Sequence, residues 1–170
     1  AVCYILNPEK TAGVLYMNSN CGCDANEIYQ GMIQTKKQHG KTWGRQGYHF
    51  VISFAPGEAT EETAFAVMQD FTDQYLKDEY DYVYVVHNDK EHIHGHLIFN
   101  SLSYSGYKYH YKEGQWKNEI QPVTDSICRK YGLDGLLEKE IKTGRSYKEW
   151  ESGKNGNMTW RQLIRKELDI

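Results

Sequence analysis

The sequence has no apolar run long enough to cross a membrane, so it predicts no transmembrane helix. The chain opens Ala-Val-Cys-Tyr, without an initiator methionine, a basic segment or the short apolar stretch of a signal peptide. We expect this start to be a fragment boundary, with an N-terminal strand missing before it. Internal repeats and low-complexity tracts are absent as well, and 170 residues are enough for one domain with a hydrophobic core.

Cysteine is scarce, and none of the four cysteines has the spacing of a zinc ribbon. Cys21 and Cys23 form an isolated Cys-Gly-Cys pair, while Cys3 and Cys128 stand alone. This pattern favours reduced thiols in a cytoplasmic protein over a disulfide or a second metal site.

The chain has no basic excess, and its net charge of −3, taken alone, argues against a protein that binds nucleic acid. The distribution is uneven, however. Residues 1–100 carry 7 basic against 13 acidic side chains, whereas residues 101–170 carry 13 basic against 10 acidic ones. A mildly basic end can still place phosphate contacts locally, so charge leaves the partner open.

The spacing of apolar residues predicts an alternation of strands and helices. Short or alternating apolar runs predict strands over residues 13–18, 49–54, 82–86 and 93–100, the third of them central. Helical periodicity with capping residues predicts helices from Asp24 toward Lys37, over 60–76, between Pro122 and Gly132, and after Thr159. We therefore expect an α+β fold, a two-layer sandwich with a central antiparallel sheet and helices packed on one face.

Histidines gather in one short segment, because four of the seven lie between residues 87 and 96. His92, His94 and His96 alternate, and alternation on a strand directs their side chains to one face. His87 lies just before a polar turn, so a hairpin can bring it back beside them. Neutral imidazole is the commonest protein metal ligand, and this arrangement predicts a metal site.

The segment from His87 to Asn100 has the pattern H-x-D-x-x-H-x-H-x-H-L-x-x-N. It resembles the third motif of relaxases, the mobilization nucleases that start conjugative DNA transfer, and in particular their P class. These proteins belong to the HUH endonucleases, whose paired histidines flank one bulky apolar residue; here that residue is Gly95. Two further segments are similar to the first and second motifs of the family, namely Tyr-Ile-Leu-Asn-Pro-Glu-Lys-Thr at 4–11 and Ser-Phe-Ala-Pro-Gly-Glu at 53–58.

The resemblance implies a catalytic domain over residues 1–140, with 141–170 as a C-terminal extension that ends in a helix and belongs to the same domain. Its implied activity is site- and strand-specific cleavage of single-stranded or hairpin DNA at an origin of transfer. A tyrosine forms a 5′-phosphotyrosyl intermediate with metal assistance, and the same site can rejoin the ends. The implied partners, besides DNA, are accessory DNA-processing proteins and a type IV coupling protein, all in the cytoplasm and without a membrane.

The metal ligands are assigned as His87, His94 and His96, because three neutral ligands keep positions open for a phosphate oxygen and leave the ion its charge. Nitrogen ligands also shift preference from magnesium toward softer ions. We expect one divalent ion, magnesium or manganese in the cell, with zinc, cobalt or nickel possible in vitro. His92, the extra histidine, is expected beside these ligands or near the phosphate.

The remaining roles follow from the resemblance and from chemistry. Tyr4 is the expected nucleophile, with Tyr16 as its rival, and Ser53 is expected to contact DNA beside the cut. Asp89 can orient a ligand imidazole by accepting its second N–H, and Glu58 is a rival for that role or for a general base.

The aromatic and basic stretch over 104–117 offers further DNA contacts through Lys108, Lys112 and Trp116, since rings stack on bases and lysines pair with phosphates. It can equally be an alternating edge strand. Two other functions stay open: a zinc-dependent phosphodiester hydrolase that needs no tyrosine, and a non-catalytic nucleic-acid-binding module whose metal is closed in by four histidines.

Overall fold

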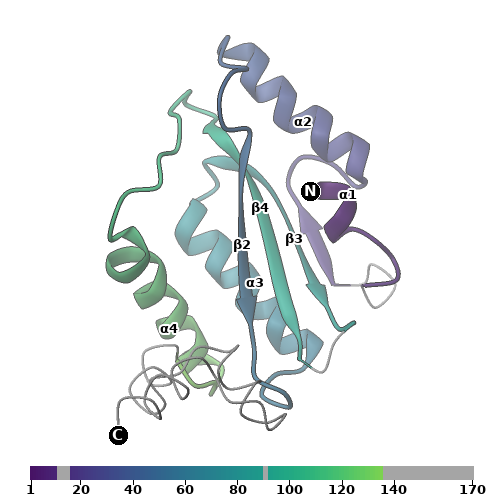
Figure 1. Cartoon of the computed structure of the whole chain (residues 1–170), viewed down its shortest axis with the longest axis vertical. Helices are drawn as coiled ribbons and strands as arrows, with labels where there is room; N and C mark the ends of the chain where they lie inside the picture. Colours follow the sequence, from purple (N-terminus) through teal and green to yellow (C-terminus); the bar gives the residue numbers. More distant parts are fainter. Residues whose placement is uncertain (11–15, 90–91, 136–170) are drawn as a thin grey trace, which may run out of the picture.

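The computed structural model describes residues 1–10, 16–89 and 92–135 (Figure 1). Their strands form one antiparallel sheet in the order β1-β3-β4-β2, with bounds β1 Met17–Ser19, β2 Gly47–Ser53, β3 Tyr80–His87 and β4 His94–Ser103. The helices are α1 Val2–Ile5, α2 Ala25–Gln38, α3 Glu61–Leu76, the π-helical turn η1 Trp116–Ile120 and α4 Gln121–Lys130. The expected α+β fold on a central antiparallel sheet is confirmed, and β3 is an inner strand as predicted.

Helices α2 and α3 begin at capping residues that the sequence indicates. The Asp24 side chain accepts hydrogen bonds from the backbone N–H groups of Asn26 and Glu27, and Glu27 accepts one from the N–H of Cys23. Thr60 accepts from the N–H of Thr63 at the start of α3. These bonds satisfy donors that have no partner inside a helix, which fixes where each helix begins.

One face of the sheet carries the main hydrophobic core. Alternate residues of the two inner strands, among them Tyr82, Tyr84, Leu97 and Phe99, pack there against the buried side of α3 and against α4. Burial of this layer supplies most of the hydrophobic stabilisation of the domain. The core therefore lies behind the histidine strand, on the side away from its imidazoles.

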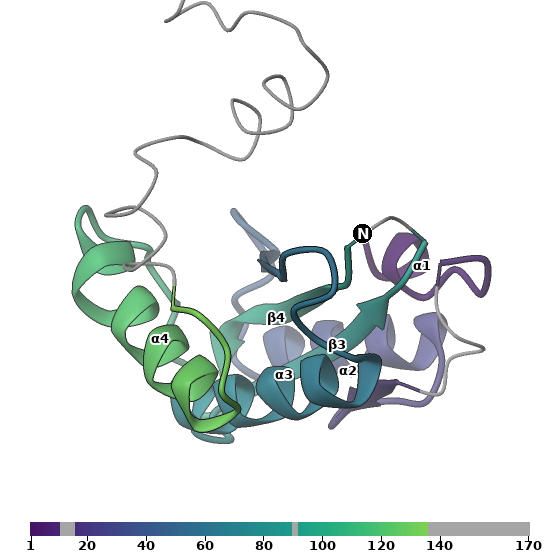
Figure 2. The ribbon, with the colours of Figure 1, turned by 90° about the horizontal axis from the view of Figure 1, so that it is seen from below.

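The opposite face carries a smaller apolar cluster, and here the structure differs from the expected packing on one face only. Ile28 of α2 and Ile5 of α1 pack on Val83, Val85 and Ile98. Figure 2 shows α1 and α3 on opposite sides of the sheet. The reason is that β3 is apolar on both faces, so its second face also needs a cover. The outer strand β2 leaves this second face open, and Val51 is 45% exposed there.

Asn100, the last residue of the histidine motif, serves this packing. Its buried amide donates to the carbonyl oxygen of Met32 in α2 and to the Asp81 carboxylate in β3. The bond ties α2 to the sheet, because a buried amide must be satisfied.

The remaining expectations fall partly outside the described residues. The expected first strand over 13–18 is seen only as Met17–Ser19, and residues 11–15 are not described. The helix after Thr159 and the extension over 141–170 also lie outside the described residues. No helix in the described part of the chain has the length and apolar character to span a membrane.

Candidate active site

Three histidines meet on the open half of the second face. His87 at the end of β3 lies directly across from His94 in β4, and His96 follows two residues later on the same face. One ring nitrogen from each lies within 4.8 Å of the others, and all three side chains are buried. The ring centroids of His87 and His96 are 4.5 Å apart. The predicted hairpin and the predicted ligand set are thus brought together as a cluster that can hold a metal.

Hydrogen bonds leave one nitrogen of each imidazole for a metal. The carbonyl oxygen of Ile5 can only accept, so the His87 Nε2 at 2.7 Å carries the proton and Nδ1 keeps its lone pair. By the same logic the His94 Nδ1 donates to the carbonyl oxygen of His92 at 3.3 Å, which leaves Nε2.

The third imidazole gives the clearest sign of a missing partner. His96 Nδ1 lies 2.8 Å from the Nε2 of His49 in β2, whereas its buried Nε2 has no hydrogen-bond partner among the described residues. A buried nitrogen without a partner is costly unless a cation binds it. The three residues therefore fit a divalent metal.

The electrostatics favour neutral ligands. Burial and the neighbouring imidazoles lower the pKa of His96 to about 3. Burial also lowers the pKa of His94 and of His49. Neutral imidazoles at physiological pH are ready to bind a metal without first losing a proton.

Tyr4 is linked to this cluster through two charged side chains. Its hydroxyl oxygen accepts a hydrogen bond from Lys10 Nζ at 3.2 Å. Lys10 Nζ lies 3.4 Å from the Asp89 carboxylate, whose other oxygen is 3.8 Å from His94 Nε2. Asp89 is thus an ion-pair partner beside a ligand, and at 3.8 Å it does not make the direct hydrogen bond expected of it.

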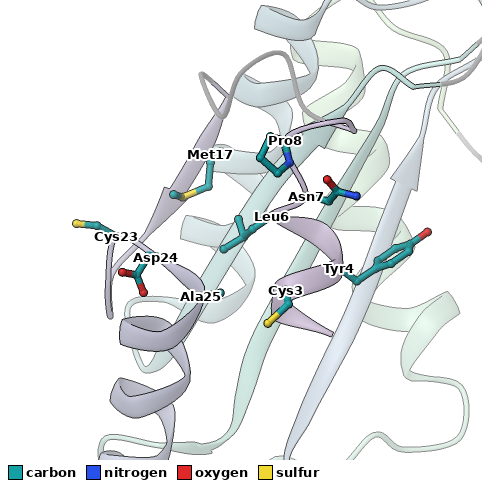
Figure 3. Close-up of a pocket in the computed structure, with 9 residues that line it drawn as sticks. All are labelled: Cys3, Tyr4, Leu6, Asn7, Pro8, Met17, Cys23, Asp24 and Ala25. Carbon is teal, nitrogen blue, oxygen red and sulfur yellow. The ribbon is translucent and has the colours of Figure 1, made fainter.

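Tyr4 itself is 56% exposed, which the predicted role of its hydroxyl as a nucleophile requires. Tyr4, Cys23 and Asp24 are among the residues that line a hollow of about 460 Å³ between α1 and the start of α2, and in Figure 3 the Tyr4 ring points away from Cys23 and Asp24. The rival Tyr16 donates its hydroxyl to Glu62 of α3 at 2.7 Å, and its ring packs on Phe65. Tyr16 is therefore engaged on the core side of the sheet.

The other predicted residues fall at different distances from the cluster. Ser53 is the register partner of His94, so its exposed side chain lies on the same face. The His92 ring centroid is 5.5 Å from that of His94, but His92 contributes no nitrogen to the three-histidine cluster. Glu58 accepts a hydrogen bond from the backbone N–H of Ala55 and so closes the turn after β2. The structure brings Ser53 and His92 beside the cluster and assigns Glu58 a local structural bond.

Gly95, at the position where the resemblance implies a bulky apolar residue, faces away from the histidines. A Cβ atom at this position would lie 2.3 Å from the Sδ of Met68 in α3. Met68 is fully buried. The space that a bulky side chain at position 95 would fill is therefore occupied by Met68 of α3.

The aromatic and basic stretch is a loop after β4, joined to it by one isolated bridge between Leu102 and Lys108, and not the alternative edge strand. Lys108 donates to the carbonyl oxygen of Trp43 and lies 4.0 Å from the centroid of its ring. The Lys112 N–H donates to the side chain of Gln115, and Trp116 is 44% exposed at the start of η1.

A groove of about 380 Å³ runs between this loop and β2. Arg45, His110 and Tyr111 line it together with His49, which touches His96. A guanidinium, an imidazole and an exposed phenol can contact phosphates and bases.

Sequence reasoning missed Lys10, His49 and Arg45. Lys10 stands inside the first motif, and that position was the available signal. His49 lies on a predicted strand, but its contact with His96 depends on strand register, which the sequence leaves open. Arg45 carries no local pattern at all.

Comparison with known proteins gives one family. The model of the relaxase family described as MobA/VirD2-like, nuclease domain, matches residues 4–133. The chain is 26% identical to the Staphylococcus aureus "Protein rlx" over 89% of its own length and 45% of that protein. It is 27% identical to the "Group II intron-interrupted relaxase LtrB" of Lactococcus lactis, over 98% of its own length and 36% of that protein. The chain thus spans less than half of these relatives, and no solved structure matches.

Proposed function

Because this chain belongs to the MobA/VirD2-like relaxase nuclease family, we propose that it is a DNA relaxase that cleaves one strand at an origin of transfer. Tyr4 attacks a phosphodiester of single-stranded or hairpin DNA and forms a 5′-phosphotyrosyl linkage with a free 3′-hydroxyl. The linkage conserves the energy of the broken bond, so the same site rejoins ends. Residues 1–140 form the catalytic domain in this proposal.

One observation carries the assignment of roles. The hydroxyl of an exposed tyrosine joins, through Lys10 and Asp89, to a buried cluster of three histidines. An attacking oxygen must be held close to the group that binds the phosphate, and this chain of contacts provides that proximity. A divalent ion bound by His87, His94 and His96 would supply positive charge for a non-bridging phosphate oxygen.

The residues of the chain orient the DNA. In this proposal Ser53 donates to the phosphate beside the cut, which its register position across from His94 supports. The groove formed by Arg45, His110 and Tyr111 offers a path for the strand as it continues past β2. Lys108, Lys112 and Trp116 extend this surface, and their phosphate contacts make binding sensitive to salt.

The setting follows from the same assignment. We propose magnesium or manganese as the ion in the cell, with zinc, cobalt or nickel able to replace it in vitro. The free state of all four cysteines fits a cytoplasmic protein. Accessory DNA-processing proteins and a type IV coupling protein are the proposed partners.

The test is the fate of a labelled single-stranded oligonucleotide incubated with the protein and Mn²⁺ and analysed on a denaturing gel. Its nick site is first selected from a randomised library by covalent capture on the unmodified chain. Wild-type protein should give a slow, protein-linked band, and peptide mapping should place the phosphate on Tyr4. Tyr4→Phe should form no adduct while binding Mn²⁺ and DNA as before, because only a hydroxyl is removed.

Tyr16→Phe is the matched control and should form the adduct at the wild-type rate, since its hydroxyl bonds to Glu62. An adduct mapped to Tyr16 would overturn the assignment of the nucleophile. Free fragments without any adduct would instead support a metal-dependent hydrolase. An intact oligonucleotide that is bound but never cut would support a binding module.

A further inference from the structure

The Lys10 side chain, which links Tyr4 to the histidine cluster, also contacts the hydroxyl and the ring of Tyr4 directly. Its Nζ donates to the Tyr4 hydroxyl and lies 4.4 Å from the centroid of the Tyr4 ring. We propose that Lys10 is a further catalytic residue, which binds the attacking oxygen of Tyr4 and stabilises its negative charge during strand transfer. This inference rests on the proposed role of Tyr4 as nucleophile.

The backbone around Lys10 is built to aim this side chain. The N–H of Lys10 donates to the carbonyl oxygen of Asn7, and the Asn7 side chain accepts from the N–H of Glu9. The Lys10 carbonyl oxygen accepts from the N–H of Asn88, directly after the ligand His87. The turn over Asn7–Lys10 therefore follows Tyr4 closely in the chain. Its far end is fixed by a hydrogen bond to the hairpin that carries His87.

Asp89 holds the charge of Lys10 in place. Its carboxylate lies 3.4 Å from Nζ, and the side chains of Lys10 and Asp89 are only 25% and 20% exposed. The hydrogen bond to Tyr4, opposed by burial and aided by Asp89, raises the pKa of Lys10. Lys10 thus stays protonated and has no lone pair to accept a proton.

The chemistry balances without a change in Lys10. The Tyr4 oxygen forms a bond to phosphorus, and its proton passes to solvent. The bond between phosphorus and the 3′-oxygen breaks, its electron pair goes to that oxygen, and water supplies the proton of the new hydroxyl. In the rejoining direction the phenolate is the leaving group, and the same N–H donor stabilises it.

The experiment measures single-turnover adduct formation with the selected oligonucleotide and Mn²⁺. Lys10→Ala should slow adduct formation about 100-fold, the loss typical of removing one donor to a developing oxyanion. It should slow rejoining equally and leave the final fraction of adduct, the DNA affinity and the Mn²⁺ affinity near their wild-type values. Lys10→Arg should recover most of the rate, and Lys10→Gln, which keeps the reach but not the charge, should not.

Rescue by a small cation separates catalysis from structure. Propylammonium should restore part of the Lys10→Ala rate, whereas tetramethylammonium, which has no N–H donor, should not. Lys77→Ala, which removes an exposed charge at the end of α3, should react as wild type.

Two results would overturn the inference while leaving the proposed function intact. One is an adduct on Tyr4 that forms at the wild-type rate in Lys10→Ala. The other is a slow Lys10→Ala that neither arginine nor propylammonium rescues, which would mark a purely structural role. Absence of any adduct with wild-type protein would instead contradict the proposed function, and the inference with it.

Discussion

Gly95 stands where the resemblance implies a bulky apolar residue, yet the space beside it is filled by Met68. Its missing side chain leaves room for Met68, whose Sδ would lie 2.3 Å from an added Cβ. Protein interiors are close-packed, so a second apolar group cannot share that space. Gly95 and Met68 therefore form one packing unit between β4 and α3.

The Gly95→Val substitution tests this unit. We expect it to lower the free energy of unfolding by about 1–3 kcal/mol, the usual cost of overpacking. Combined with Met68→Ala, it should cost at least about 1 kcal/mol less than the sum of the two single changes, because valine fills the cavity left by methionine. Urea denaturation of the three variants gives these values.

Mn²⁺ affinity is the control for this substitution, since residue 95 faces away from the imidazoles and the affinity should not change. Additive losses in the double variant would show that Gly95 and Met68 do not share the space.

At the scale of elements, β2 is the strand that completes the site. Its residues facing the cluster are His49, Val51 and Ser53, which pair with Ile98, His96 and His94 of β4. The His49 side chain lies within hydrogen-bond distance of a proposed ligand, with 2.8 Å between its Nε2 and His96 Nδ1. The edge strand therefore fixes the ring of His96 from the side.

Removing that support should weaken metal binding. His49→Ala should raise the Kd for Mn²⁺ about 10- to 100-fold, as is typical when the partner of a ligand imidazole is lost. His49→Gln should lose less, because its amide oxygen can still accept from His96 Nδ1. Calorimetric titration measures both.

His39→Ala removes an exposed imidazole at the end of α2 and is the matched control. A Kd for His49→Ala equal to that of wild type would contradict a supporting role for His49.

The elements also show what the sequence can and cannot predict. The long helices and inner strands follow from apolar periodicity and capping residues, and the alternation of His94 and His96 correctly predicts a shared face. The four-residue helix α1 is too short to show a period. The bond from Lys10 to Asp89 joins positions far apart in the chain, and no local pattern encodes it. The sequence also did not predict that α1 and α2 cover the second face of the sheet, because an apolar strand does not show which helix packs on it.

For the whole molecule, the buried imidazoles couple folding to pH. The pKa of His96 falls from 6.5 to about 3 on folding, mainly because of burial. Between these values the unfolded chain binds a proton that the folded chain excludes. The contribution of His96 to the free energy of unfolding should therefore be fully present above pH 6.5 and should be lost progressively as the pH drops below that value.

By pH 5 this one residue should cost the metal-free protein about 2 kcal/mol. The lowered pKa values of His94 and His49 act in the same direction. The slope of the free energy of unfolding against pH is measured by chemical denaturation in the presence of a chelator. The pH runs from 7.5 to 5, a range of about 2.5 units around the histidine pKa.

His96→Gln should flatten this slope, while His39→Gln should retain it. Equal slopes for wild type and His96→Gln would show that burial of His96 is not linked to folding.

The contact between Gly95 and Met68 also bears on how distant relatives are recognised. A search pattern that demands a bulky apolar residue between two histidines evaluates the residues of one strand only. Here the same volume is encoded in a helix that precedes the motif in the chain. A pattern confined to β4 therefore does not register that the space beside residue 95 is filled, because the side chain that fills it belongs to α3.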